Sequence, residues 1–375
     1  MNATKYDLLL KPITINRLEL ANRVVMAPTH LGLNNEEGFV TPEAIDFFVK
    51  RGKGGTSLII LGAVAINPRR FDNMMRMSDD KFVPGLKELI DRIHDTSGAK
   101  VGAQLFDWLK FGRHWKQLFS DLPAEDIQKS IEYHEKGAIR ALEAGFDAIE
   151  IHAAHGYVLA GSLSQLNKRE DGYGKTFEGR LRLLTEVYAK VRAVTGPDYP
   201  VGIRINGDEF IVGGNTLKHS RLIAKKAAEM GFDYISITAG GKYEDSPGLI
   251  PKFECPHPYP PVGGYSGHRS MPPLDMPEAV NVYLAADLRQ TIRQAGFTTP
   301  VMAAGRIPDP ALAERILEQE QADIIALSRP LLRDYEWVRK AREGASKEIK
   351  KCIYCNWCTE RELYGEPSLC QFTKE

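Results

Sequence analysis

The chain has 375 residues, of which 43% are hydrophobic and 26% charged, and its 49 basic residues balance 49 acidic residues. Such a chain is long enough for one (β/α)₈ barrel or for two or three smaller domains, and its composition is that of a globular protein. The zero net charge argues against a nucleic-acid-binding protein or a polybasic membrane-binding protein. The longest run of apolar residues and glycine, residues 58–66, is too short for a membrane span, and the N-terminus lacks a signal-peptide pattern, so we expect a cytoplasmic protein.

Eight short runs rich in β-branched residues alternate with longer amphipathic stretches. Most of them are continuously apolar, as expected of parallel strands that are buried on both faces. The predicted strands are Val24–Ala27, Leu58–Leu61, Val101–Leu105, Ala148–His152, Val201–Arg204, Tyr234–Thr238, Val301–Ala304 and Ile324–Leu327. Eight alternations of strand and helix predict an α/β fold, a closed (β/α)₈ TIM barrel. The alternative is an open doubly wound sheet, which is disfavoured because no G-x-G-x-x-G motif follows an early strand.

Helical patterns separate these strands, for example at Ile127–Ala144, Leu217–Met230 and Pro310–Gln319. Two long connections, Phe106–Glu125 and Gly240–Asp275, interrupt the rhythm. The second is rich in proline and glycine, and a loop of this length within a domain is usually functional, disordered or a lid.

Four of the five cysteines lie close together at the C-terminal end, with the spacing C-x2-C-x2-C-x11-C. They are Cys352, Cys355, Cys358 and Cys370. Without a secretion signal, clustered cysteines are not expected to form disulfides. Three thiolates spaced two residues apart can occupy corners of an iron–sulfur cubane, and a later cysteine can close the fourth corner. The alternatives are a structural zinc site, which more often uses two separate C-x2-C pairs, and reactive or incidental thiols. We therefore predict a barrel over residues 1–345 and a cluster-binding tail over residues 346–375.

Residues at the carboxyl ends of the strands are the candidate site, because barrel active sites lie at that end. Ala63 follows the second strand and is small enough to let a flat group lie close. Polar side chains that could bind the edges of such a group are Gln104 and Arg204. The turns after the seventh and eighth strands combine glycine or serine with an arginine, at Gly305–Arg306 and Ser328–Arg329. Backbone N–H groups and guanidinium groups bind phosphate, so the pattern predicts a planar cofactor that carries a phosphate.

A second set of candidates follows the first and fourth strands, where His30 and the segment H-A-A-H-G-Y occur. We expect His152 and His155 to clamp a substrate oxygen. A metal pair is the weaker alternative, because no carboxylates accompany the H-x-x-H pattern. Tyr157 is a candidate proton donor or a core aromatic, and His30 is a site residue or a helix cap.

Several segments together resemble the old yellow enzyme family of flavin oxidoreductases over residues 6–345: "NRVVMAPTHLGL", "EAGFDAIEIHAAHGYVLAGSLSQLNKREDGYGKTFEGRLRLL", "PVMAAGRI" and "ADIIALSRPLLRD". The most specific part is H-A-A-H-G-Y followed by N-x-R-x-D-x-Y-G. The cysteine tail resembles the subgroup that includes bacterial 2,4-dienoyl-CoA reductase and trimethylamine dehydrogenase. Members of that subgroup carry FMN in the barrel and a 4Fe–4S cluster just after it.

The resemblance implies a role for each candidate. Its flavin-ring contacts would be Pro28, Thr29, Ala63, Gln104 and Arg204, and its phosphate contacts Ala304, Gly305, Ser328 and Arg329. His152 and His155 would bind the carbonyl oxygen of a substrate, with His30 nearby on the dienoyl reductase pattern. The proton would come from Tyr157 or from Tyr243. Tyr243 is the alternative because a dienoyl reductase would have a histidine near this position. The four tail cysteines would ligate the 4Fe–4S cluster.

The implied activity is ene reduction, in which a hydride passes from N5 of FMN to an activated C=C bond conjugated to a carbonyl or a CoA thioester. The alternatives are a flavin amine dehydrogenase or demethylase, a non-catalytic electron-transfer subunit and a zinc-stabilised barrel lyase. Because the sequence stops shortly after Cys370, without the FAD and NAD(P)H domains of the subgroup, we expect a separate electron-transfer protein or FAD/NAD(P)H subunit as partner. Whether copies of the chain form a homo-oligomer stays open. The loop after the third strand, Q-L-F-D-W-L-K-F-G-R, departs from the family pattern and leaves the substrate open.

Overall fold

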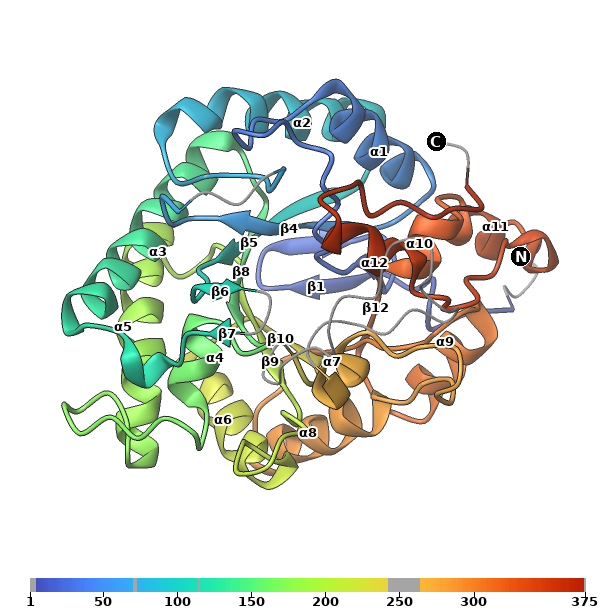
Figure 1. The fold of residues 1–375 in the computed structure, drawn as a ribbon. Coiled ribbons are helices and arrows are strands. Elements are labelled where there is room, and N and C mark those ends of the chain that lie inside the picture. The colour runs from blue at the N-terminus through green and yellow to red at the C-terminus, as the bar shows by residue number, and fades with distance from the viewer. Residues whose placement is uncertain (1–4, 70–72, 113–114, 242–263, 374–375) are drawn as a thin grey trace.

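Eight parallel strands close into a barrel in chain order (Figure 1). The computed structural model describes residues 5–69, 73–112, 115–241 and 264–373. The strands are β3 (Val24–Met26), β4 (Leu58–Ala65), β5 (Lys100–Phe106), β8 (Ala148–Ala153), β9 (Val201–Asn206), β10 (Tyr234–Thr238), β11 (Val301–Ala303) and β12 (Ile324–Leu327). All eight predicted strands are present within two residues of their expected starts. The pairing of β9 with β10 and of β12 with β3 closes the ring, so the open-sheet alternative is wrong.

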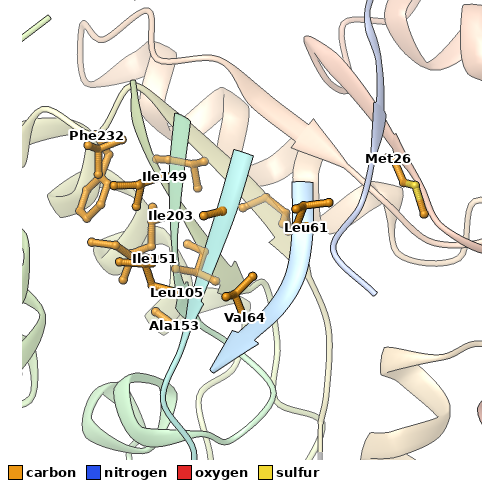
Figure 2. Packing of buried hydrophobic residues seen from close by; sticks show 14 of the residues in the cluster. Met26, Leu61, Val64, Leu105, Ile149, Ile151, Ala153, Ile203 and Phe232 are labelled. Atoms are coloured by element: carbon orange, nitrogen blue, oxygen red, sulfur yellow. The ribbon is translucent and has the colours of Figure 1, made fainter. Parts of the chain in front are cut away.

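The strands are buried on both faces because alternate residues face the barrel interior and the surrounding helices. On β8, Ile149 and Ile151 belong to the large outer cluster, part of which Figure 2 shows, whereas Ala148 belongs to the interior cluster. The same alternation turns Glu150 and His152 inward. Continuous apolar sequence is the pattern that this two-sided burial requires.

A short N-terminal hairpin closes one end of the barrel. Its strands are β1 (Ile13–Ile15) and β2 (Leu18–Leu20), which pair antiparallel. Ile15, Leu18 and Leu20 pack against interior side chains at the starts of the barrel strands, including Leu58 and Tyr234. The hairpin therefore covers the amino ends of the strands and leaves the carboxyl ends open.

Helices surround the barrel and cover the outward faces of its strands (Figure 1). They are α1 (Pro42–Lys53), α2 (Val83–Thr96), α3 (Ala124–Ala144), α5 (Phe177–Thr195), α6 (Leu217–Met230), α8 (Val282–Gln294), α9 (Pro310–Glu318), α10 (Arg329–Arg333) and α11 (Trp337–Arg342). The three predicted helices are confirmed as α3, α6 and α9. Helices α3 and α6 end at Gly145 and Gly231, whose φ angles of 87° and 89° lie in the left-handed region that glycine adopts without strain.

Short elements lie in the connections and in the tail. They are α4 (Val158–Leu163), α7 (Gly264–Ser270), the paired β6 (Phe111–Gly112) and β7 (Trp115–Lys116), α12 (Trp357–Leu363), and the 3₁₀ helices Asp80–Phe82, Phe119–Asp121 and Ser346–Glu348. The cysteine tail folds back onto the barrel: the backbone N–H of Ser368 donates to the carbonyl of Leu31 at 2.8 Å. The Thr373 hydroxyl donates to the carbonyl of Arg333 at 2.9 Å. In the described ranges, no helix has the length and apolar character needed to cross a bilayer.

Candidate active site

A cavity lies at the carboxyl ends of the strands, and most of the predicted site residues line it. The predicted residues in its wall are Pro28, Thr29, His30, Ala63, Gln104, His152, His155, Tyr157, Arg204, Ala304, Gly305, Ser328, Arg329 and Cys358. Tyr243 falls outside the described residues. The structure thus brings together residues from all parts of the chain, while their individual roles stay predictions.

One wall of the cavity is shaped by small residues where β3 and β4 approach each other. Thr29 and Gly62 form an isolated antiparallel bridge. A Cβ atom on Gly62 would lie 2.2 Å from Cβ of Pro28, so only glycine allows this approach. The methyl group of Ala63 follows and leaves room for a flat ligand beside Pro28 and Thr29.

Buried polar side chains form the floor of the cavity. Gln104 Nε2 donates to Glu150 Oε1 at 2.7 Å, and Arg204 Nη1 donates to the Ser236 hydroxyl at 3.3 Å. Among the described residues, Arg204 Nε and Glu150 Oε2 have no hydrogen-bond partner. Buried polar groups are normally satisfied, so an orphaned donor at the floor of a cavity indicates space for a polar ligand.

Burial dominates the electrostatics of this floor. It raises the pKa of Glu150 to about 7, although the nearby Arg204 charge and the hydrogen bond from Gln104 oppose the shift. Burial lowers the pKa of Arg204, and Glu150 partly offsets this effect. The charge state of Glu150 therefore changes near neutral pH, directly beside two predicted cofactor contacts.

The two predicted histidines lie side by side in the cavity wall. His152 Nε2 is 3.4 Å from His155 Nδ1, and His155 Nε2 is 2.9 Å from the Thr238 hydroxyl. Burial, and then the charge of Arg204, lowers the pKa of His152 to about 3, so this ring is neutral. Because the facing nitrogens lie within reach of each other, one ligand oxygen can approach both.

The backbone around His155 is tightly constrained. His155 has a φ angle of 59° and forms an isolated bridge with Gly241. A Cβ atom on Gly241 would lie 2.4 Å from Cα of His155. A side chain at position 241 would therefore displace the histidine.

Tyr157 stands beside this pair, at the start of α4. Its ring meets Phe106 edge to face with centroids 4.5 Å apart, and it lies 5.4 Å from the ring of His152. Phe106 in turn stacks on Trp108 at 5.4 Å. This aromatic wall encloses the region next to the histidines.

The predicted phosphate contacts line the cavity next to Thr29. The hydroxyls of Thr29 and Ser328 are 2.7 Å apart. Arg306 and Arg329 both line the cavity. Arg306 Nη1 donates to the carbonyls of Pro273 at 2.5 Å and Leu274 at 2.7 Å and to that of Met276. Arg306 thus holds the segment around residue 274 through one nitrogen, and its contact with a phosphate stays a prediction.

The four tail cysteines are free thiols, and Cys358 lines the cavity. Burial raises the pKa of Cys358 to about 12; Arg329 opposes this shift, and the other three thiols add to it. The thiols are thus close enough to influence one another. No three His, Cys, Asp or Glu side chains among the described residues are arranged to hold a single metal ion.

Sequence reasoning missed several lining or supporting residues: Met74, Phe106, Glu150, Thr238, Asn281, Tyr354 and Thr359. Glu150 was detectable, because it lies two residues before His152 on one strand and shares its inward face. Phe106 and Thr238 are the last residues of β5 and β10 and could likewise have been placed at the mouth of the barrel. Met74, Asn281 and the tail residues come from connections whose conformation the sequence pattern does not define.

The sequence matches the NADH:flavin oxidoreductase / NADH oxidase family over residues 8–116, 114–237 and 277–348. An "NADH oxidase" of Thermoanaerobacter brockii is 33% identical over 91% of this chain and 52% of its own length. A "Metal reductase" of Desulforamulus reducens is 32% identical over 98% of this chain and 54% of its own. The chain thus spans about half the length of these two relatives. An "NADPH dehydrogenase" of Halalkalibacterium halodurans is 33% identical over 89% of this chain and 93% of its own.

Solved structures share the fold. A 2-naphthoyl-CoA reductase complex superposes with a TM-score of 0.83 at 24% identity, over 98% of this chain and 57% of that one. Histamine dehydrogenase from Rhizobium sp. 4-9 gives a TM-score of 0.79 at 23% identity, over 98% of this chain and 52% of that one. The family match and the curated relatives lead to one conclusion: the chain belongs to the NADH:flavin oxidoreductase / NADH oxidase family of flavin-dependent oxidoreductases.

Proposed function

We propose that this chain binds FMN at the mouth of the barrel and reduces an activated C=C bond conjugated to a carbonyl or a CoA thioester. The proposal depends mainly on one observation. The imidazoles of His152 and His155 lie side by side in the cavity that Arg204 also lines, and the buried Nε of Arg204 has no hydrogen-bond partner among the described residues. The histidine pair suits a substrate oxygen, and the Arg204 guanidinium suits the polar edge of a flavin. Bound FMN would supply the hydride.

The residues present fit this cofactor. Gln104 uses its amide N–H on Glu150, which leaves its oxygen to accept from a flavin edge, and Arg204 Nε lacks a partner within the described part of the chain. The proposed ring contacts are Pro28, Thr29, Ala63, Gln104 and Arg204, and the proposed phosphate contacts are Ala304, Gly305, Ser328 and Arg329. Arg204 would also stabilise negative charge on the reduced cofactor.

The histidine pair would stabilise the negative charge that builds on the substrate oxygen as its double bond is reduced. His152 is neutral, and with its proton on Nε2 it would donate to the substrate oxygen. If the Thr238 hydroxyl donates to His155 Nε2, the proton of His155 sits on Nδ1, where it also faces the shared position. One well-placed donor of this kind is worth roughly 3 kcal/mol in the transition state.

Tyr157 is the proposed acid that protonates the second carbon, because it lies in the same wall as the histidines. A positioned acid contributes about a hundredfold in rate. Tyr243, outside the described residues, is the alternative donor.

The tail is proposed to bind a 4Fe–4S cluster through Cys352, Cys355, Cys358 and Cys370. The support is the C-x2-C-x2-C spacing, the mutual influence of the thiols and the position of Cys358 in the cavity wall. Electrons would pass between this cluster and a separate FAD- or NAD(P)H-binding protein. The matched region covers only 52% of the NADH oxidase relative, which supports the proposal that this chain exchanges electrons with a further unit.

A second candidate function is amine oxidation. An "N,N-dimethylglycine/sarcosine dehydrogenase" of Chromohalobacter salexigens is 29% identical over 97% of this chain and 52% of its own length. The stacked Phe106 and Trp108 with Tyr157 form an aromatic wall of the kind that can face a cationic amine. The histidine pair favours ene reduction, because an imidazole N–H donor matches a carbonyl oxygen and not an ammonium group.

Anaerobic turnover with an artificial electron donor or acceptor separates the two functions. We expect the wild type to reduce enones or enoyl-CoA thioesters, and the His155→Ala variant to lose at least about tenfold in rate while it retains FMN. Oxidation of methylated amines without any alkene reduction would refute the ene-reductase assignment. A folded protein that binds no FMN would refute both functions.

A further inference from the structure

Asn356 lies within the cysteine motif, directly after Cys355, and joins the tail to the mouth of the barrel. Its side chain is 1% exposed. Its Oδ1 accepts a hydrogen bond from Arg329 Nη1 at 2.6 Å, and its Nδ2 donates to the carbonyl of Met271 at 3.0 Å. The amide is thus oriented by a partner at each end.

The backbone of the motif is shaped to present this side chain. Tyr354 and Asn356, on either side of Cys355, have φ angles of 58° and 62° in the left-handed region that residues other than glycine seldom adopt. The carbonyl of Asn356 then accepts from the N–H groups of Thr359 and Glu360 at 3.0 Å each, which starts helix α12. The direction of the Asn356 side chain is therefore tied to the conformation of the cysteine loop.

Arg329 receives its orientation from this tail and from the neighbouring loop. Besides Asn356, its Nη1 donates to the carbonyl of Pro272 at 2.9 Å. The guanidinium also lies over the ring of Tyr354, 4.7 Å from the ring centre. These partners come from outside helix α10, on which Arg329 sits, so the side chain is held at the phosphate end of the cavity by contacts from the tail and the 271–272 loop.

We infer that Asn356 is a positioning residue that fixes Arg329 for the phosphate group of FMN, so that the fold of the cysteine tail sets the affinity for the phosphorylated flavin. The inference rests on the proposed binding of FMN. A guanidinium recognises phosphate through a planar fork, and a fork that is already oriented loses less conformational freedom on binding. Asn356 contacts the arginine and is not among the residues that line the cavity.

The coupling is reciprocal, because two binding events that influence each other do so by the same factor in both directions. A change in the tail that moves Asn356 weakens phosphate binding, and occupation of the phosphate site stabilises the tail. Riboflavin, which has the ring system without the phosphate, should show neither effect.

The test compares dissociation constants for FMN and riboflavin, measured by fluorescence titration of the flavin-depleted protein with its iron content recorded. The preference for FMN, taken as the riboflavin constant divided by the FMN constant, reports the phosphate alone. We expect Asn356→Ala to lower this preference about tenfold by weakening FMN, with riboflavin affinity unchanged. The matched control is Thr373→Val, which removes a different hydrogen bond between the tail and α10 and should leave the preference at the wild-type value.

A double-mutant cycle shows whether Asn356 acts through Arg329. In an Arg329→Lys background, which keeps the charge but removes the fork, Asn356→Ala should change the preference no further. An equal drop in both backgrounds, or a wild-type preference in Asn356→Ala, would overturn the inference. If Asn356→Ala does not fold, Asn356→Asp serves instead: its carboxylate should neutralise the arginine and lower the preference, and an unchanged preference would count against the inference.

The outcome separates this inference from the proposed function. A wild type that binds neither flavin refutes the function itself. A wild type that prefers FMN to riboflavin, with the same preference in every Asn356 variant, leaves the function standing and refutes only the role of Asn356.

Discussion

Replacing Glu150 by glutamine tests whether the floor of the cavity carries a group that titrates near neutral pH. The substitution keeps the shape of the side chain and an oxygen that can accept from Gln104 Nε2. In the wild type this nitrogen lies 2.7 Å from Glu150 Oε1. What it removes is the ionisable carboxyl. The pKa of that carboxyl is about 7 in the folded protein, against an ordinary value of 4.5, mainly because the group is buried.

The direction of the effect follows from this raised pKa. Between pH 4.5 and 7 the folded wild type holds a proton that the unfolded chain has released, so the stability of the wild type falls as the pH rises through this window. Above pH 7 the folded protein must keep a desolvated carboxylate. The glutamine variant has no such group and is spared this loss.

The magnitude comes from the same values. A pKa change from 4.5 to about 7 corresponds to about 3 kcal/mol in full, of which about 2 kcal/mol falls between pH 5 and pH 8. Urea unfolding of the flavin-free wild type and of Glu150→Gln at both pH values gives the difference in unfolding free energy. We expect this difference to move by about 2 kcal/mol in favour of the variant from pH 5 to pH 8. A difference that is constant with pH would refute the reasoning.

Three further substitutions test other parts of the site and the barrel. Thr238→Val should lower the rate of alkene reduction about tenfold because His155 loses the partner of its Nε2, and Thr238→Ser should restore it; equal rates in both variants would show that the hydroxyl does not orient the ring. Tyr157→Phe should leave the FMN content unchanged but slow alkene reduction about a hundredfold, with the rate measured by stopped-flow reoxidation of the flavin. A wild-type rate in this variant would point to another acid. Gly202→Ala should destabilise the barrel by about 3 kcal/mol in urea unfolding, since its Cβ would lie 2.1 Å from the buried ring of Tyr234; a loss well under about 1 kcal/mol would mean that the ring can move aside.

The barrel was predictable because its strands occur as continuous apolar runs between amphipathic stretches. Eight such runs in order, from the one at Val24 to the one at Ile324, are typical of a closed parallel barrel. The N-terminal hairpin was not predicted, since three-residue strands such as Ile13–Ile15 are too short to show a period. Its role as a cover for the barrel depends on contacts that are distant in sequence.

The site was predictable in position but not in orientation. Knowing that Gln104, Arg306 and Arg329 lie at or just after the ends of strands places them at one end of a barrel. It does not show that Gln104 donates to Glu150, or that Arg306 Nη1 donates to backbone carbonyls. The orientation and the hydrogen-bond partner of each side chain depend on its burial and on competing partners, which only the folded chain brings together.

The central claim is that the mouth of this barrel holds FMN beside a cubane bound by the tail thiolates. The most direct measurement is the content of FMN, iron and acid-labile sulfide in protein purified without oxygen, together with its absorption spectrum. The claim predicts about one FMN, about four irons and about four sulfides per chain, with overlapping flavin and iron–sulfur bands. A folded, colourless protein that takes up no FMN when the flavin is supplied in excess, or that contains a single zinc ion and no iron, would contradict it.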